Sequence, residues 1–339
     1  MGNAAGRVWW IMVVGQLALP VQANDAFAEV AGGSITLVPT AAVVMEDEDL
    51  LLSLNEVDVR YVFHNTSDVD VTHTIAFPMP DKRTLSGFYG HSPGAFHAFS
   101  VEVDGRLLPA TRVIRAYRMP PDTRAEQGRG EDITDLLHTL GLSDDDIVAF
   151  ADASVESIPD HRAKSRRKLS AVLPRLKKAG LIEDDLTFQH DGPRSKPQVE
   201  HVEHVANIVL ATTWTWEATF PARARVTVRH RYRPHWGSYQ HATFEPRFCP
   251  DPGLNAAMER RSAKRAVVPS FSALAYVLSS GALWHGPIRR FHLVVRKPTA
   301  ESVLSTCFDG ALTKINATDF EFTATDYTPR GDILIGVVR

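Results

Sequence analysis

The chain of 339 residues has a formal net charge of −3 at pH 7, with 44% hydrophobic and 23% charged residues. This composition is typical of a globular protein, and the nearly balanced charge disfavours nucleic acid as a partner, because nucleic-acid-binding domains usually carry a net basic charge. The length would ordinarily indicate about two domains, although β-rich folds can extend further as one unit.

The N-terminus has the pattern of a secretory signal peptide. Arg7 precedes an apolar run over residues 8–19, and small residues follow up to Ala23. The run is short for a membrane span, so we expect residues 1–23 to be cleaved and the mature chain to begin at Asn24. An uncleaved anchor is the disfavoured alternative. The sequence therefore predicts a periplasmic or secreted protein with no transmembrane span after cleavage.

Residues 24–119 are predicted to form an N-terminal β-rich portion. Apolar and polar residues alternate over 57–63 and again over 69–77, and the turn residues 65–68 lie between them. This pattern predicts two strands joined as a β-hairpin. The dipeptide Asp104-Gly105 predicts a further hairpin, because it tolerates the positive φ of a tight turn.

Residues 120–200 are predicted to form a helical insert. Apolar residues recur at helical spacing over 133–140, and Ser143 is expected to begin a second short helix with three aspartates in its first turn. A third helix follows, in which Pro174 is expected to break or restart the helical path. The basic stretch 161–168 favours a solvated helix face over a membrane or polyanion contact, because acidic stretches lie on both sides of it.

Residues 201–339 are predicted to form a C-terminal β-rich portion that completes or packs on the sandwich. Its most distinctive stretch is 212–237, where an aromatic strand and an alternating strand meet at Pro221, which predicts a hairpin with one apolar face. Such a hairpin needs a second β-layer to cover it. The predicted fold is mainly β, an antiparallel β-sandwich with immunoglobulin-like layers and the helical insert outside it. Whether the two β-rich portions form one sandwich or two domains stays open here.

The chain has two cysteines, Cys249 and Cys307. In a protein expected outside the cytoplasm, a disulfide between them is the economical interpretation. The alternative is a catalytic or redox thiol, which is disfavoured because no Cys-X-X-Cys spacing and no activating base can be identified.

Several segments together resemble the DUF4424 family, bacterial secreted proteins named for having no assigned function. The matching segments are Asn24-Asp25, AFPMPD from Ala76, TWEATFPA from Thr215, HRYRP from His230 and YVLSSGALWHGPIRRFHLVV from Tyr276, with Cys249 before and Cys307 after the last of these. The turn Pro234-His235-Trp236-Gly237 departs from the pattern, in which a small residue would follow the proline. The resemblance implies a periplasmic β-sandwich protein and transfers no catalytic residue.

One cluster has metal-ligating residue types, namely Glu200, His201, Glu203 and His204. On a helix the two histidines would share a face, but on a strand they would point to opposite faces. They also lack the i, i+4 spacing of a zincin motif, so a solvated or hydrogen-bonded pair is favoured over a metal site.

Four tryptophans are candidate ligand-binding residues, namely Trp214, Trp216, Trp236 and Trp284. They could form a platform on which a sugar stacks, although aromatic residues on alternating strands more often belong to a core. The chain contains no Gly-X-Ser-X-Gly elbow and no glycine-rich phosphate loop before a helix, so we predict no catalytic residue and no cofactor.

Three classes of function follow from these patterns. The leading one is a non-catalytic periplasmic binding or envelope-associated protein, whose partner would be a small ligand or another envelope protein that the sequence does not name. The second is a secreted hydrolase with an acid-base site that sequence spacing does not reveal. The third is a structural subunit that joins a partner through an exposed strand edge.

Overall fold

The largest sheet has eight strands, in the order β18-β19-β16-β3-β4-β13-β7-β8. All neighbouring strands are antiparallel except β3 and β16, which pair in parallel. The strands are β3 (Val43–Ser53), β4 (Val57–Asn65), β7 (Ser100–Val103), β8 (Arg106–Leu108), β13 (Arg225–Tyr232), β16 (Ile288–Arg296), β18 (Thr313–Lys314) and β19 (Asp319–Tyr327).

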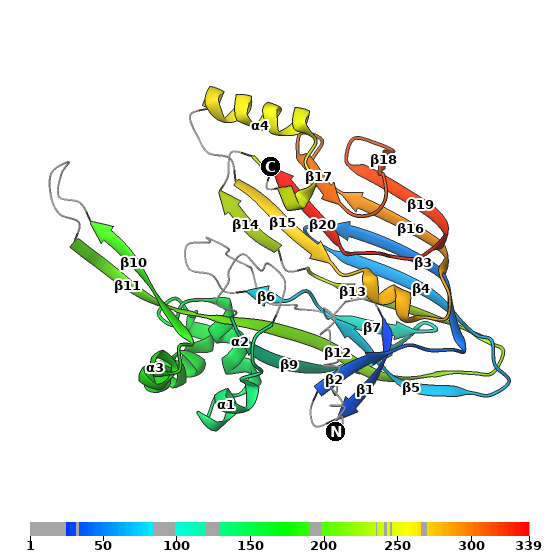
Figure 1. Cartoon of the computed structure of the whole chain (residues 1–339), viewed down its shortest axis with the longest axis horizontal. Coiled ribbons are helices and arrows are strands. Elements are labelled where there is room, and N and C mark those ends of the chain that lie inside the picture. The colour runs from blue at the N-terminus through cyan, green and yellow to red at the C-terminus, as the bar shows by residue number, and fades with distance from the viewer. Residues whose placement is uncertain are drawn as a thin grey trace, which may run out of the picture.

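A six-stranded and a four-stranded sheet accompany it (Figure 1). The first contains β1 (Ala26–Ala31), β2 (Ser34–Val38), β5 (Val71–Pro78), β6 (Lys82–Arg83), β9 (Thr111–Arg118) and β12 (Ile208–Phe220). The second contains β14 (Trp236–Gln240), β15 (Ser270–Tyr276), β17 (Val303–Cys307) and β20 (Ile333–Val338).

This computed structural model describes residues 25–31, 34–83, 99–119, 129–189, 198–234, 236–240, 243–244, 246–265 and 270–338. The predicted signal peptide and most of the polar loop at the start of the helical insert lie outside these residues. The mainly β fold with sandwich-like layers is confirmed. Among the described residues, no helix is long and apolar enough to cross a membrane.

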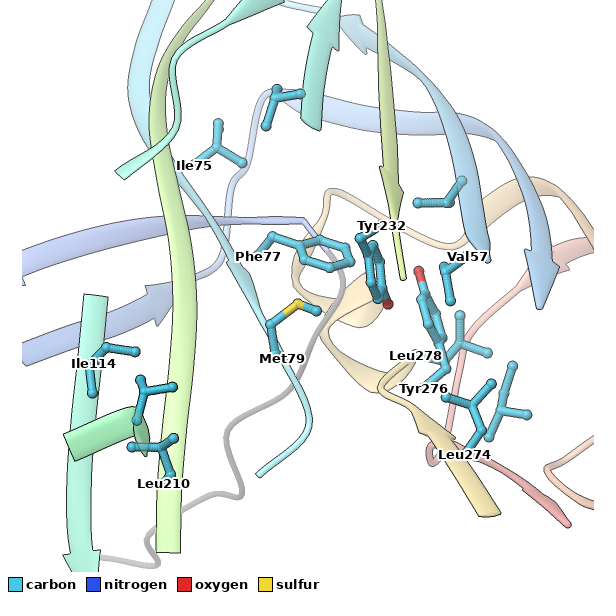
Figure 2. Close-up of a cluster of buried hydrophobic side chains, with 14 of the residues drawn as sticks. Val57, Ile75, Phe77, Met79, Ile114, Leu210, Tyr232, Leu274, Tyr276 and Leu278 are labelled. Carbon is cyan, nitrogen blue, oxygen red and sulfur yellow. The ribbon is translucent and has the colours of Figure 1, made fainter. Parts of the chain in front are cut away.

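One core lies between the eight-stranded sheet and the two smaller sheets. Figure 2 shows Phe77 of β5, Tyr232 of β13 and Tyr276 of β15 beside one another, so a side chain from each sheet reaches this point. All three residues belong to a single cluster of buried side chains. Strands from both β-rich portions, such as β4 and β13, are hydrogen-bonded neighbours in the same sheet.

Two turns that looked like hairpins cross between layers instead. β4 lies in the eight-stranded sheet and β5 in the six-stranded sheet, and the same holds for β13 and β12. The predicted hairpins over 57–77 and 212–237 are therefore wrong, and each is an arch from one layer to the other. A hairpin and an arch have the same alternation and the same turn residues. An arch forms here because the two strands of each pair lie in facing sheets and bury their apolar faces in the core between them.

The predicted hairpin at Asp104-Gly105 is confirmed. It joins β7 to β8, and the two turn residues have φ values of 46° and 78°. Both lie in the left-handed region that this type of two-residue turn requires.

The insert has three helices, α1 (Thr134–Thr139), α2 (Asp144–Asp152) and α3 (Ala163–Lys178). The first two contact strands of the six-stranded sheet, and α3 packs on α2. The predicted start of a helix at Ser143 is confirmed, and Ser143 caps α2 through a reciprocal capping box with Asp146. The expected break at Pro174 is wrong, because α3 continues through it. Leu169 and Leu176 on either side are fully buried, and their packing offsets the hydrogen bond that proline cannot donate.

The insert also contains two long strands that periodicity did not predict. β10 (Ile182–Gln189) and β11 (Gln198–Ala206) pair as an antiparallel ribbon, which projects beyond the helices in Figure 1. The remaining elements are three short 3₁₀ helices, η1 (Asp160–Arg162), η2 (Pro246–Phe248) and η3 (Ser279–Leu283), and the helix α4 (Pro252–Arg265).

Candidate binding site

The solvent-facing side of the eight-stranded sheet carries an array of arginine and aspartate side chains, which we call the charged face. On each strand these residues alternate with buried ones, as in β4, where Asp58 and Arg60 lie between the buried Val57, Val59 and Tyr61. The charged face comprises Asp47, Asp49, Asp58, Arg60, Arg229, Arg231, Arg290, His292, Arg296 and Asp319.

Strand register brings these residues together from distant parts of the chain. Asp49 of β3 lies opposite Arg60 of β4 on one side and His292 of β16 on the other. Arg60 in turn lies opposite Arg229 of β13. Because directly opposed side chains on one face are neighbours, four strands contribute to one continuous polar surface.

A depression of about 480 Å³ lies within the charged face. Leu51 and Val294, which are opposite in register, contribute its apolar part. Its lining residues are Asp49, Leu50, Leu51, Asp58, Arg60, Arg229, His292, Val294 and Arg296. The depression thus combines an apolar floor with a charged rim.

The two aspartates of the rim are held by several cationic or donor groups. Arg60 Nη2 and Arg290 Nη2 each lie 3.1 Å from Asp49 Oδ2, and His292 Nδ1 lies 3.0 Å from Asp49 Oδ1. Arg229 donates two hydrogen bonds to Asp58, of 2.8 and 2.5 Å. Such charge-assisted and bidentate pairs fix the orientation of the side chains as well as stabilising them.

These contacts set the ionisation of the carboxylates. Partial burial opposes ionisation of Asp49, but the hydrogen bonds from His292 and Arg60 and the charge of Arg290 outweigh it, so the pKa of Asp49 is lowered. Hydrogen bonds from Arg296 lower the pKa of Asp319 to about 2. Both groups are therefore carboxylates at neutral pH, able to orient arginines and unsuited to act as general acids.

A second polar pair lies in the core. His230 Nε2 is 2.9 and 3.0 Å from the two carboxylate oxygens of Asp25, and both residues are fully buried. Burial raises the pKa of Asp25, and the charge and hydrogen bond of His230 oppose this effect. The backbone carbonyl of Asp25 also accepts a 2.6 Å hydrogen bond from Trp284 Nε1. The rings of Phe77 and Trp216 pack against His230, at 5.0 and 4.9 Å between ring centres. These hydrogen bonds therefore anchor the N-terminal segment in the core.

The four candidate tryptophans have different surroundings. Trp216 and Trp284 are buried in the core, and Trp214 is half-buried and stacks on Phe99 at 4.9 Å between ring centres. Trp236 is half-buried on β14, in the four-stranded sheet. None of the four lines the depression of the charged face.

The candidate metal residues lie on β11 and not on a helix. His204 Nδ1 is 2.5 Å from Glu156 Oε1, and Ser157 donates a 2.8 Å hydrogen bond to Glu203, so these side chains pair with the insert. His201 is three positions away on the strand, and its side chain lies outside the described residues. In the part of the chain that the structure describes, no group of three or more histidine, cysteine, aspartate or glutamate side chains could hold a metal ion.

The two cysteines lie at disulfide distance, with a Cα separation of 5.0 Å. Cys307 ends β17, and Cys249 lies between η2 and α4. A bridge here ties α4 to the four-stranded sheet, beside a second small core formed by Phe244, Phe248, Met258, Phe271 and Val338.

The charged face could not be recognised in the amino-acid sequence. The residues that form it stand at the polar positions of the alternating strands, such as Asp58, Arg60, Arg229 and Arg231. Without the register, nothing indicated that β3, β4, β13 and β16 would be neighbours.

Two solved structures show distant similarity to the chain. One is a Legionella pneumophila protein described as a "putative nutrient binding protein", with 14% identity, a TM-score of 0.42 and coverage of 92% of this chain and 72% of that one. The other is yeast LTA4 hydrolase, with 8% identity, a TM-score of 0.25 and coverage of 87% of this chain and 29% of that one. Neither similarity carries an argument about function.

No curated protein matches the sequence significantly. The model of the DUF4424 family, a domain of unknown function, matches residues 23–335, which is nearly the whole chain. The resemblance drawn from the sequence motifs is thereby confirmed, and the chain belongs to the DUF4424 family.

Proposed function

We propose that this protein is a non-catalytic binding protein of the periplasm or cell envelope, and that its ligand binds in the depression of the charged face. The observation that carries the proposal is the depression itself, where guanidinium groups from three strands surround an apolar floor. A concave site with an apolar surface and a few convergent polar groups is the usual form of a small-ligand site.

The arginines are preorganised for binding. Arg229 and Arg296 each have a bidentate carboxylate partner, and Arg60 is held by Asp49. All three extend from strands in the interior of a sheet, which is a rigid support. Side chains fixed in this way lose less conformational entropy when a ligand arrives.

The ionisation of the rim favours binding over acid-base catalysis. A glycosidase-like or protease-like site needs a carboxyl group with a raised pKa, or a base poised near neutral pH. Asp49 has the opposite tendency, since arginine and histidine neighbours lower its pKa. This favours a binding protein over the alternative of a secreted hydrolase.

The edges of the eight-stranded sheet favour a ligand over a strand-adding partner. At its two edges lie β8, with three residues, and β18, with two. Very short edge strands are a common way in which proteins prevent further pairing. A structural subunit that adds a strand to this sheet is therefore the weaker alternative.

The proposed location rests on the N-terminal pattern and the cysteine pair. An apolar run over residues 8–19, followed by a small residue at the expected cleavage position Ala23, is typical of a signal peptide, and disulfides persist in oxidising compartments. N-terminal sequencing of the exported protein should give Asn24 as the first residue. Recovery of a chain that begins at Met1 from the cytoplasm would contradict this part of the proposal.

Equilibrium dialysis against a small-molecule extract of the source cells, followed by mass spectrometry, tests the binding. The wild-type protein should retain at least one compound that the Arg60→Ala/Arg229→Ala double variant does not. The matched control is Arg112→Ala. Arg112 lies outside the charged face, and its Nη2 donates a 2.6 Å hydrogen bond to Asp145. Equal retention by the wild-type protein and the double variant would refute a site on the charged face.

A further inference from the structure

We infer that the ligand of the charged face is an organic anion, bound through a carboxylate by the arginines of the depression while its apolar body covers Leu51 and Val294. This inference rests on the proposed function and names the chemical class of the ligand.

The acceptors of the rim are already engaged. Both oxygens of Asp49 have a donor, His292 Nδ1 on one and two arginine nitrogens on the other. Both oxygens of Asp58 accept from Arg229, and Arg231 Nε lies 3.3 Å from one of them. A cationic or donor-rich ligand would compete with these arginine and histidine groups for the same oxygens, which weakens its attraction to the rim.

The donors of the rim exceed these acceptors. A guanidinium group has five N–H donors, and Arg60 uses only Nη2 toward the described residues. Arg229 and Arg296 use Nε and Nη2, so Nη1 of each has no protein acceptor in the described part of the chain. The surplus of N–H groups around the depression matches a ligand that supplies acceptor oxygens.

The charge of the rim also favours an anionic ligand. Three arginines, Arg60, Arg229 and Arg296, line the depression with two aspartates, Asp49 and Asp58. Over the wider face the formal charges cancel once Glu321, 3.6 Å from His292, is included. Five arginines, Arg60, Arg229, Arg231, Arg290 and Arg296, then meet five carboxylates, Asp47, Asp49, Asp58, Asp319 and Glu321. Short directional hydrogen bonds therefore contribute more to selectivity than a long-range field, which favours a small anion over a polyanion.

The floor distinguishes an organic anion from an inorganic one. Leu51 and Val294 are both half-buried, and each presents apolar surface to the depression. An inorganic phosphate or sulfate would satisfy the N–H groups and leave this surface exposed to water. A carboxylate attached to an aliphatic or cyclic body would cover it and gain the free energy of burying apolar area.

A set of matched probes tests the inference on the full-length mature protein. Cyclohexanecarboxylate carries both features, cyclohexylmethanol has the ring without the charge, cyclohexylmethylamine reverses the charge, and inorganic phosphate has the charge without the ring. We expect cyclohexanecarboxylate to bind at least about tenfold more tightly than each of the other three, as one charge-assisted hydrogen bond predicts. Ligand-observed NMR titration gives the four affinities.

Variants link the preference to the depression. Arg60→Ala should weaken cyclohexanecarboxylate binding about tenfold, and Arg60→Lys should weaken it less, because the charge remains while the planar fork is lost. Leu51→Ser should weaken it severalfold through the floor. Arg112→Ala should leave the affinity unchanged. Thermal unfolding of each variant shows whether it is folded.

The outcomes separate this inference from the proposed function. Equal affinity for the alcohol, the amine or phosphate, or no binding of any probe, would overturn the inference of an organic anion. Tight binding that Arg60→Ala and Leu51→Ser both leave unchanged would also overturn it. If the extract yields a neutral or cationic compound whose retention depends on the charged face, this inference fails and the proposed function stands. If no retained compound depends on the charged face, the proposed function fails.

Discussion

The side chain of Asn65 joins the two arches that carry the chain between the layers. Its Nδ2 donates 2.8 Å hydrogen bonds to the carbonyl of Val69 in its own arch and to that of Phe220 in the other. Its Oδ1 accepts from the backbone N–H and the hydroxyl group of Ser67, at 3.0 and 2.7 Å. Since Asn65 is fully buried, water has little access to replace these bonds.

The change Asn65→Ala should therefore be costly. It removes the Nδ2 hydrogen bonds to two backbone carbonyls. The carbonyl of Val69 keeps a 3.0 Å bond from the Ser67 hydroxyl group, whereas the lost bond to Phe220 is fully buried. A lost hydrogen bond contributes about 1 kcal/mol, and a buried carbonyl left without a partner costs a further 1–3 kcal/mol or so. We expect the free energy of unfolding to fall by about 3 kcal/mol, measured by urea unfolding as a lower midpoint with an unchanged m value.

Ser67→Ala is the matched control. It removes hydroxyl hydrogen bonds near the surface and leaves both Nδ2 bonds of Asn65 in place, so it should cost less than about 1 kcal/mol. A loss below about 1 kcal/mol for Asn65→Ala, equal to that of the control, would show that Asn65 does not hold the two arches together.

Three further predictions concern the core, the cysteines and the carboxylates. Trp216→Ala should lower the free energy of unfolding by about 3–5 kcal/mol, because the indole is buried. Trp216→Phe should cost much less, because it keeps a ring and removes an N–H that has no partner among the described residues. Similar effects of the two changes on denaturant unfolding would contradict a packing role. Thiol titration of the denatured, unreduced protein should find no free thiol at Cys249 or Cys307, and two reactive thiols would refute the bridge. Reduction should lower the unfolding midpoint, since a bridge across 58 residues contributes about 4 kcal/mol in the chain-entropy model. The lowered pKa of Asp319, about 2 against an ordinary 3.8, means that its contribution to stability is present above about pH 4 and is lost as the pH falls toward 2. Arg296→Ala should raise the NMR titration midpoint of the Asp319 carboxyl toward its ordinary value, and an unchanged midpoint would show that Arg296 does not cause the shift.

Local features of the fold could be predicted from the sequence. The alternation in β4, the positive-φ turn at Asp104-Gly105 and the start of α2 after Ser143 each depend on a few neighbouring residues. The family could also be recognised, because its motifs occur in order along the chain.

Features that depend on distant partners could not be predicted. A strand pair such as β12 and β13 alternates in the same way whether it forms a hairpin or an arch, and only the partners β5 and β4 decide between them. The parallel pairing of β3 with β16 joins segments more than 200 residues apart, such as Asp49 and His292. The charged face arises from this pairing, so it could not be recognised from spacing along the chain.

The position of a bound ligand tests the central claim most directly. A crystal structure of the protein with the compound retained from the extract should show that compound in the depression, in contact with Leu51 and Val294. An acceptor oxygen should lie within roughly 3 Å of a guanidinium nitrogen of Arg60 or Arg229. A compound bound elsewhere on the protein, with the charged face unchanged and empty, would contradict the account.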